Sequence, residues 1–233
     1  MADAKDKPDD SPSENTVPKA VVSRLSLYLR ELQHLMRDGH ETTSSTQLGR
    51  LLGFTDAQVR KDLAYFGQFG YPGIGYRCDE LVAAIKRILG TNKEWPVALV
   101  GIGNLGRALL GYRGFGEQGF RVVAAFDVDP NKVGAVIEGV PVFSFEQMSE
   151  ICQEKHIRLA IIAVPAVAAQ AVADAVVKAG VDGVLNFAPV TISLPKEVST
   201  VGVDLAIELE QLSFSVASKA PKTEEVEVKE LAD

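Results

Sequence analysis

The sequence predicts an α/β protein made of two domains and a final helix. Residues 97–100 form an aliphatic run that ends in Gly-x-Gly-x-x-Gly over residues 101–106, and small and apolar residues follow at helical spacing. Strand, tight turn and helix in this order open a doubly wound, Rossmann-type parallel sheet. Ahead of this stretch, short amphipathic helices and a glycine-rich hairpin have the pattern of a winged helix. We therefore expect a winged-helix domain, then the Rossmann-type domain, then a C-terminal helix.

Length, composition and cysteine content indicate a cytoplasmic protein. The chain has 233 residues, of which 46% are hydrophobic, and no apolar run reaches the roughly 18 residues of a membrane helix. The N-terminus lacks the apolar core of a signal peptide. Cys78 and Cys152 are too few for a disulfide framework or a metal site, which favours plain thiols in a reducing compartment. We expect no membrane contact, and a redox role for either thiol stays open.

Charge is distributed unevenly along the chain. The formal net charge is −7, yet residues 19–96 carry more lysine and arginine than aspartate and glutamate. Local charge governs contact with phosphates, so this region can bind nucleic acid although the whole chain is acidic. Residues 1–16 and 218–233 are charged and poor in apolar side chains, which predicts disordered tails.

The first domain, expected over residues 17–94, contains four helices and a hairpin. The first helix covers 19–37, where leucine and valine recur every three or four residues after Pro18. Ser44 caps a short second helix that Gly53 ends, and Thr55 caps a third helix over 56–66. Glycine-rich residues 67–77 predict the wing, and 80–89 a fourth helix. The second and third helices are thus a helix-turn-helix pair.

The third helix is the predicted recognition helix. It presents Gln58, Arg60 and Lys61 as long polar side chains, while Val59, Leu63 and Phe66 are expected to face the core. Such side chains reach phosphates and base edges in a major groove. The alternative is that the basic residues of this region only form a solvated helical face.

The second domain, expected over residues 95–203, carries a dinucleotide-binding fingerprint. Gly101 allows the tight turn, Gly103 lets the backbone approach a pyrophosphate, and Gly106 lets the helix pack on its strand. The next predicted strand, 121–126, ends in Asp127, which can accept both hydroxyls of an adenosine ribose and would repel a 2′-phosphate. NAD(H) is therefore favoured over NADP(H). The alternative is a vestigial glycine turn that binds nothing.

Strands and helices continue to alternate after Asp127. Strands are predicted at 140–142, 159–164, 184–186 and 201–203, and helices from Ser144 to about Lys155 and over 166–179. This alternation gives a parallel, doubly wound sheet. The last helix, within 204–217, has one apolar stripe and further apolar residues on other faces. That is more apolar surface than a helix on one side of a sheet needs, so it predicts a partner. The alternative is a helix of the sheet's own core.

Several ordered motifs together resemble the Rex family of bacterial redox-sensing transcriptional repressors. They lie at 45–49, 58–63 (Gln-Val-Arg-Lys-Asp-Leu), 65–70 with 73–76, 100–106, 126–134 and 185–189 (Leu-Asn-Phe-Ala-Pro). The resemblance implies a homodimer that binds double-stranded DNA at an inverted-repeat operator. It also implies that NADH releases the protein from DNA, that NAD⁺ competes and permits binding, and that the C-terminal helix is exchanged between subunits.

The resemblance also suggests residues for each role. For DNA binding they are Arg24, Arg30, Ser44, Ser45, Gln47, Arg50, Gln58, Arg60, Lys61, Tyr65, Gly73, Gly75 and Tyr76. For NADH and NAD⁺ they are Gly101, Ile102, Gly103, Asn104, Leu105, Gly106, Asp127, Val128, Lys132, Val164, Pro165, Asn186, Phe187, Ala188 and Pro189. For the ligand-dependent switch they are Tyr112, Asp204 and Leu205. Tyr71 and Pro72 stand where family wings commonly carry a basic residue.

Physical reasoning predicts a preference for NADH. The nicotinamide ring of NAD⁺ is cationic, and the apolar stretches 163–165 and 187–189 would make its desolvation costly. Two other functions remain as alternatives. A small NAD-dependent dehydrogenase needs a general acid near the nicotinamide, and the three histidines are poorly placed for it. A DNA-binding protein whose second domain only dimerises would not respond to NADH.

Overall fold

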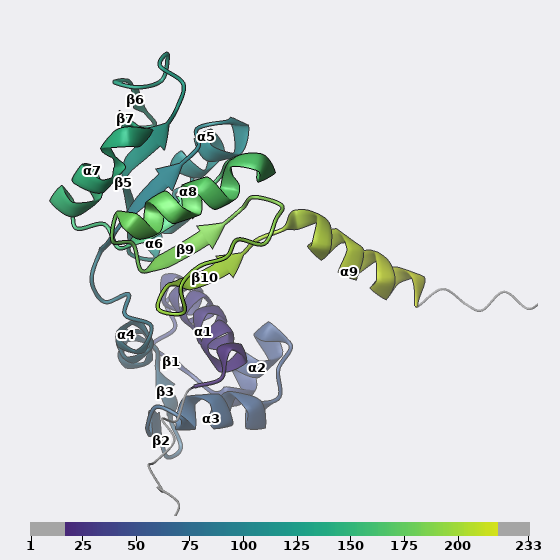
Figure 1. Ribbon diagram of the computed structural model, residues 1–233. Helices are drawn as coiled ribbons and strands as arrows, with labels where there is room; N and C mark the ends of the chain where they lie inside the picture. The colour runs from purple at the N-terminus through teal and green to yellow at the C-terminus, as the bar shows by residue number, and fades with distance from the viewer. Residues whose placement is uncertain (1–16, 219–233) are drawn as a thin grey trace, which may run out of the picture. The chain divides into compact units, whose positions relative to one another are not determined.

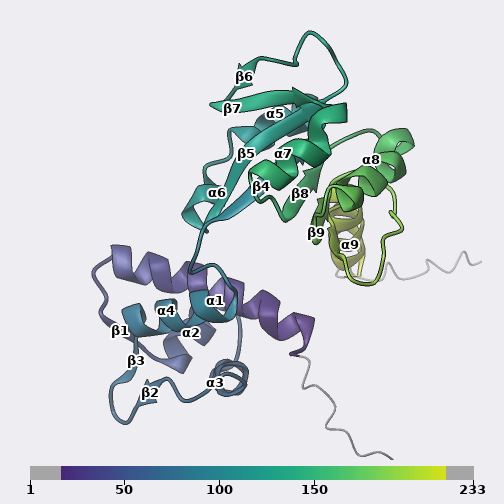
Figure 2. The same ribbon diagram turned by 60° about the vertical axis from the view of Figure 1, so that its left-hand side comes forward.

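The computed structural model describes residues 17–218. The predicted tails, 1–16 and 218–233, lie outside the described residues apart from Ser218. The chain divides into two compact units between Lys93 and Glu94, and each unit is considered by itself (Figures 1 and 2).

The N-terminal unit contains four helices, and local caps set most of their bounds. They are α1 (Lys19–Arg37), α2 (Ser45–Leu52), α3 (Asp56–Ala64) and α4 (Cys78–Ile88). The hydroxyl of Ser44 accepts a hydrogen bond from the backbone of Gln47, and that of Thr55 accepts one from Gln58, as expected of N-cap residues. Compared with the prediction, α3 ends two residues early and α4 begins two residues early.

The turn between α2 and α3 depends on two glycines. Gly53 ends α2 with φ of +75°, a conformation that glycine adopts without strain. A Cβ on Gly49 would lie 2.5 Å from the carbonyl oxygen of Phe54, so only glycine allows this close approach. The ring of Phe54 in turn packs edge-on against Tyr28 of α1, with 6.0 Å between ring centroids. The predicted helix-turn-helix is thus anchored to the core.

The wing belongs to a three-stranded sheet rather than to the two-stranded hairpin that the sequence predicted. β2 (Gly70–Tyr71) pairs antiparallel with β3 (Gly75–Arg77), and β3 also pairs with β1 (Thr42–Thr43). β1 is only two residues long and lies more than thirty residues before its partner. No local pattern announces such a strand.

The C-terminal unit is built on a seven-stranded sheet (Figure 1). Its strands are β4 (Trp95–Val100), β5 (Phe120–Asp127), β6 (Val136–Ile137), β7 (Val140–Ser144), β8 (Leu159–Ile162), β9 (Gly183–Asn186) and β10 (Ser199–Gly202). The order is β10-β9-β8-β4-β5-β7-β6. The six parallel strands therefore follow the standard dinucleotide-binding order, 3-2-1-4-5-6 read from the other edge. The predicted parallel, doubly wound sheet is confirmed, and one unpredicted strand is added at its edge, where β6 pairs antiparallel with β7.

Two apolar cores lie on opposite faces of this sheet. α7 (Met148–Glu154) and α8 (Ala166–Lys178) pack on one face, and α5 (Asn104–Leu110) and α6 (Gly114–Glu117) on the other. Alternate residues of β4 serve the two cores, since Ala98 and Val100 belong to the first and Val97 and Leu99 to the second. A 3-10 turn, η1 (Phe145–Gln147), begins the helix predicted from Ser144.

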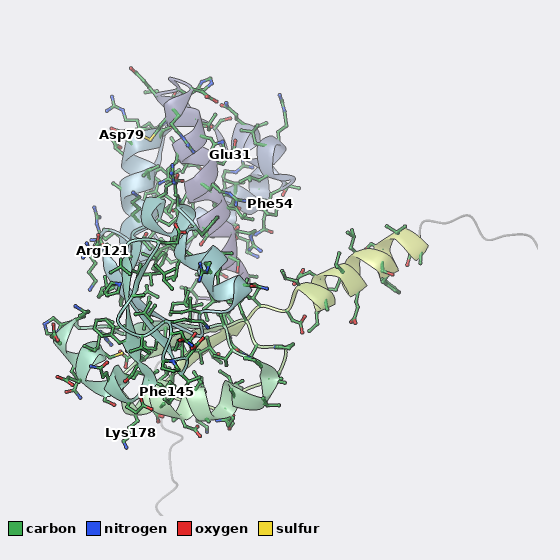
Figure 3. All side chains as sticks on the ribbon, turned by 90° about the horizontal axis from the view of Figure 1, so that it is seen from above. Glu31, Phe54, Asp79, Arg121, Phe145 and Lys178 are labelled. Carbon is green, nitrogen blue, oxygen red and sulfur yellow. The ribbon has the colours of Figure 1, made fainter. Side chains whose placement is uncertain are left out.

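The final helix, α9 (Leu205–Ala217), buries none of its side chains in this chain (Figures 1 and 3). Its exposed apolar residues are Leu205, Ile207, Leu209, Leu212, Phe214 and Val216. The alternative that α9 is a core helix of its own sheet was therefore wrong. No helix among the described residues is long and apolar enough to cross a membrane.

Candidate nucleotide and nucleic-acid sites

The glycine loop between β4 and α5 has the geometry that each of its glycines was expected to give. Gly101 has φ of +94°, and a Cβ there would lie 2.6 Å from the carbonyl oxygen of Ala163. A Cβ on Gly106 would overlap the carbonyl oxygen of Gly101. Gly103 differs from both, because a Cβ there meets no atom within 4 Å. The two outer glycines hold the loop together, and the middle one faces open space where a pyrophosphate fits.

Asp127 ends β5 and is already bonded to the glycine loop. One carboxylate oxygen accepts hydrogen bonds from the backbone of Ile102 at 2.7 Å and from the ammonium of Lys132 at 3.1 Å. The other accepts one from the backbone of Asp129 at 2.9 Å. Burial opposes ionisation of this carboxyl, but these bonds outweigh it and lower the pKa of Asp127. The charged carboxylate and Lys132 thus stand together where a ribose would bind.

The predicted nicotinamide residues divide between two places. A Cβ on Gly101 would also lie 2.6 Å from the side chain of Val164, so that side chain borders the glycine loop, and Pro165 caps α8. Asn186 is buried at the end of β9, where its amide donates to Val190 O at 2.9 Å and accepts from Ala188 N at 3.0 Å. Its polar atoms therefore shape the loop that follows β9. Sequence reasoning gave no sign of this structural role.

A hollow of about 430 Å³ with a mixed polar and apolar lining joins the loop after β9 to the start of α9. Asn186, Ala188 and Pro189 line it together with Asp204 and Ile207. Asp204 also caps α9 by accepting a hydrogen bond from Ala206 N at 2.9 Å. One of the predicted switch residues thus lies beside predicted cofactor residues. Tyr112 is exposed and packs edge-on against Phe115, and the described residues show no hydrogen bond between Tyr112 and Asp204.

The remaining predicted cofactor residues lie around the glycine loop, directly after β5 or in the loop after β9. Val128, directly after Asp127, is 79% exposed. Ile102 is buried, whereas Asn104 and Leu105 at the start of α5 are exposed. Phe187 is partly buried against the core beneath the glycine loop.

In the recognition helix α3, two of the three predicted reading side chains have partners within the unit. Gln58 donates to Asp62 at 2.7 Å. Arg60 donates to Asp56 at 2.7 Å and to Ser45 at 3.1 Å, and thereby joins α3 to α2. Lys61 is exposed, and the structure gives it no ion pair among residues 17–218.

Asp62 is the centre of a buried network that the sequence analysis missed. It is fully buried, accepts two hydrogen bonds from Arg24 at 2.5 and 2.8 Å, and accepts another from Tyr28 at 2.8 Å. Burial opposes its ionisation, but the bonds from Arg24, Tyr28 and Gln58 outweigh burial and lower the pKa of Asp62. The guanidinium of Arg24 was predicted to bind phosphate, yet it serves to hold α1 to α3. The spacing of four residues between Gln58 and Asp62 on the helix is the one local signal of this network.

The structure also corrects the predicted role of Tyr76. This residue is 8% exposed and packs in the core of the N-terminal unit, because it alternates on β3 with outward-facing neighbours. Gly75 before it has φ of +90°, and a Cβ there would overlap the carbonyl oxygen of Thr43 on β1. The exposed apolar residues of the wing are instead Ile74 and Tyr71.

The other predicted DNA residues lie on α1, on or beside α2, at the end of α3 and in the wing. Arg30, Arg50 and Tyr65 are exposed, and Gly73 lies in the wing turn with φ of +76°. Ser44 is engaged as a cap, and the side-chain carbonyl of Gln47 accepts a hydrogen bond from Thr43 at 3.2 Å. No measurement on this chain tests their contacts with DNA, so these residues stay predictions.

Both cysteines are buried. Burial raises the pKa of the Cys78 thiol, and it raises that of Cys152 to about 11. Thiols with these properties react slowly, since the thiolate is the reactive form. Among the described residues, no group of three acidic, histidine or cysteine side chains could hold a metal ion.

Two family models match the two units separately. The one described as CoA binding domain matches residues 92–190, and the one described as putative DNA-binding protein N-terminus matches residues 16–64. The crystal structure of RSP in complex with β-NAD⁺ and operator DNA superposes with a TM-score of 0.83 at 33% identity, over 88% of this chain and 94% of RSP. The crystal structure of RSP in complex with β-NADH superposes with a TM-score of 0.79 at 32% identity, over 88% of this chain and 96% of RSP.

Full-length relatives are similar over nearly their whole length. The redox-sensing transcriptional repressor Rex of Carboxydothermus hydrogenoformans is 48% identical over 200 residues, which are 86% of this chain and 96% of the relative. Rex of Pelotomaculum thermopropionicum is 46% identical over 203 residues, 87% of this chain and 95% of the relative. Identity at this level over both units assigns the fold and the family together. The chain belongs to the Rex family of redox-sensing transcriptional repressors.

Proposed function

We propose that this protein represses transcription in the cytoplasm and that NADH releases it from DNA. Residues 17–94 bind an inverted-repeat operator, residues 95–203 bind NADH or NAD⁺, and residues 204–217 join two copies into a homodimer. The observation that carries the proposal is that one chain joins a helix-turn-helix to a dinucleotide-type sheet whose Gly103 faces open space.

The chemistry of the N-terminal unit supports DNA binding. Arg30, Arg50 and Lys61 are exposed on a unit whose charge is positive, so that phosphates are attracted locally. The relative RSP is described in complex with operator DNA. α3 follows the turn after α2, the position of the helix that enters the major groove in helix-turn-helix proteins.

The chemistry of the C-terminal unit supports a dinucleotide ligand with no 2′-phosphate. Asp127 is ionised and would accept ribose hydroxyls, and the exposed Val128 offers an apolar surface beside it. Lys132 is already paired with Asp127 and Asp129, so it is a poor receptor for a second phosphate. The apolar neighbours Val164 and Phe187 favour the uncharged nicotinamide of NADH. RSP is described with both β-NAD⁺ and β-NADH.

The exposed apolar side chains of α9 support the homodimer. Leu209 and Phe214 are 67% and 75% exposed, and a chain that left this whole helix in water would be prone to aggregate. A second copy of the same chain covers both helices at once by symmetric exchange. Two recognition helices held about 34–36 Å apart would then match successive turns of DNA. A ligand that changes this spacing changes the affinity for DNA.

The experiment is a titration of NADH, and separately of NAD⁺ and coenzyme A, into the full-length protein bound to a fluorescent inverted-repeat duplex. At one stated salt concentration, release by NADH at a much lower concentration than by NAD⁺ is expected. DNA binding that responds to none of the three ligands would leave a repressor with a purely structural second domain. NADH binding without DNA binding would favour the dehydrogenase.

A further inference from the structure

Arg60 is the recognition-helix cation whose position is fixed by the fold. Only one of its terminal nitrogens is bonded, to the carboxylate of Asp56 at 2.7 Å and to the hydroxyl of Ser45 at 3.1 Å. Among residues 17–218 the structure shows no hydrogen bond from its other two nitrogens. The guanidinium is therefore held along one edge by α2 and by the start of α3, and its opposite edge is available. A pair of N–H groups on one edge is what a bidentate contact with guanine needs.

Asp56 is the residue that holds this edge, and it does little else. Its other carboxylate oxygen accepts a hydrogen bond from Ala57 N at 2.8 Å. The Arg60 and Asp56 side chains are 55% and 44% exposed, so the pair contributes little to stability. The hydrogen bond from Arg60 lowers the pKa of Asp56, so the carboxylate keeps its charge at neutral pH. An ionised acid thus stands on the first turn of the helix that carries the DNA-reading cations.

We propose that Asp56 is a specificity-determining residue of the recognition helix, acting by positioning Arg60 together with Ser45 and by opposing contacts made with phosphates alone. This inference rests on the proposed function, since it assumes that α3 reads an operator. A free arginine side chain adapts to any phosphate, whereas one held along an edge is pre-organised for a fixed partner. The carboxylate also subtracts charge from the surface on which sequence-independent binding depends. Both effects lower affinity for random DNA more than affinity for the operator.

The test compares two duplexes of equal length and composition. One is enriched by the wild-type protein from a random double-stranded library, and the other is its scrambled sequence. Dissociation constants for both are measured by fluorescence anisotropy at several salt concentrations. The variants are Asp56→Asn, Arg60→Gln and the double variant. Asp38→Asn is the matched control, because Asp38 is an exposed acid of the same unit and the structure shows no ion pair for it with Arg60.

Asp56→Asn is expected to lower the preference for the selected duplex by about 3- to 10-fold, less than the loss from removing the bidentate group itself. Most of the change should be tighter binding to the scrambled duplex, with a salt dependence steeper by up to about one phosphate contact. In the Arg60→Gln background, Asp56→Asn should lower the preference clearly less than it does in the wild type, because only the charge effect of Asp56 remains there. Asp38→Asn should leave it at the wild-type value. These last two results separate positioning from a general change in charge or stability.

Two results would overturn the inference. An unchanged preference in Asp56→Asn would show that the pair has no role in selection. An equal loss in the presence and absence of Arg60 would show that Asp56 contacts a base itself. Failure of the wild-type protein to enrich any sequence would instead refute the proposed function. NADH binding and thermal unfolding of each variant, both expected at wild-type values, identify a misfolded sample.

Discussion

Replacing Asp62 by alanine should destabilise the N-terminal unit more than replacing any other acidic residue of that unit. Asp62 is fully buried and accepts four hydrogen bonds, two from Arg24 and one each from Tyr28 and Gln58. Breaking a buried ion pair by removing one partner costs about 3–5 kcal/mol. The Arg24 side chain is 22% exposed and regains some hydration, which favours the lower end. The buried hydroxyl of Tyr28, however, loses its acceptor, at a cost of about 1–3 kcal/mol.

We therefore expect Asp62→Ala to lose about 3 kcal/mol of the free energy of unfolding of this unit, equivalent to a fall in Tm of roughly 12–24 °C for a domain of its size. Hydrogen exchange followed by mass spectrometry assigns the loss to a unit, because peptides of α1 and α3 should exchange faster while those of β4 and β5 do not change. The control Asp38→Ala removes an exposed acid and should change stability by no more than about 0.5 kcal/mol. A loss below about 1 kcal/mol in Asp62→Ala, or faster exchange confined to the C-terminal unit, would refute the reasoning.

The same network predicts a pH dependence. The pKa of Asp62 lies below its usual value in the folded protein, so folding favours the ionised form. Its contribution is complete above the unfolded-state pKa of about 3.9 and is lost as pH falls through the lower folded-state pKa. The wild-type N-terminal unit should thus lose stability on acidification below about pH 4, and Asp62→Ala should lose less over the same interval. Parallel acid titrations of the two proteins would argue against an ionised Asp62.

Other predictions concern the two binding sites and the thiols. Gly103→Val should leave the C-terminal unit folded but weaken NADH binding at least about tenfold, because its side chain enters the open space, so NADH would no longer release DNA. Gly106→Ala should instead destabilise this unit by about 1–3 kcal/mol, since its Cβ overlaps the carbonyl oxygen of Gly101; equal thermal stability of the two variants would contradict this contrast. Arg60→Ala should weaken operator binding about tenfold or more with NADH affinity unchanged, as measured by anisotropy and calorimetry. The Cys152 thiol, with a pKa of about 11, should react with a thiol reagent at pH 8 only as the protein unfolds, and rapid labelling of the native protein would refute its burial.

Local chemistry explains why so many helix bounds could be predicted. Pro18 begins α1, Ser44 and Thr55 cap α2 and α3, and Gly53 ends α2, and each acts on backbone groups within a few residues of itself. The alternation of strands and helices also predicted the parallel part of the large sheet. The features that were missed depend on distant partners. β1 pairs across more than thirty residues, and β6 is an added edge strand with only two residues.

The site residues divide in the same way. The fingerprint of the glycine loop predicted the backbone roles of Gly101 and Gly106 correctly, because a missing Cβ acts on the atoms directly around it, whereas the pyrophosphate contact of Gly103 stays a prediction. Arg24 could not be assigned from its type, because its partner Asp62 lies 38 residues further along the chain. An arginine predicted to bind phosphate was thus already committed to a carboxylate. Tyr76 was placed among the DNA residues by the family resemblance, which does not show that one face of its short strand β3 is buried.

Spacing within α3 offered more information than residue type alone. Asp56 precedes Arg60 by four residues, and Gln58 precedes Asp62 by four, so each pair lies on one face of the helix. An acid placed in this way can either hold a cation at the surface of the helix or draw an amide away from that surface. The pair of Asp56 and Arg60 is of the first kind, and the pair of Asp62 and Gln58 is of the second. Asp56 is exposed and bonds Arg60 at the surface, whereas Asp62 is buried and draws Gln58 towards the core. Burial of the acid therefore decides where its partner lies: Gln58 is bonded towards the core, whereas Arg60 and Lys61 stay exposed on α3.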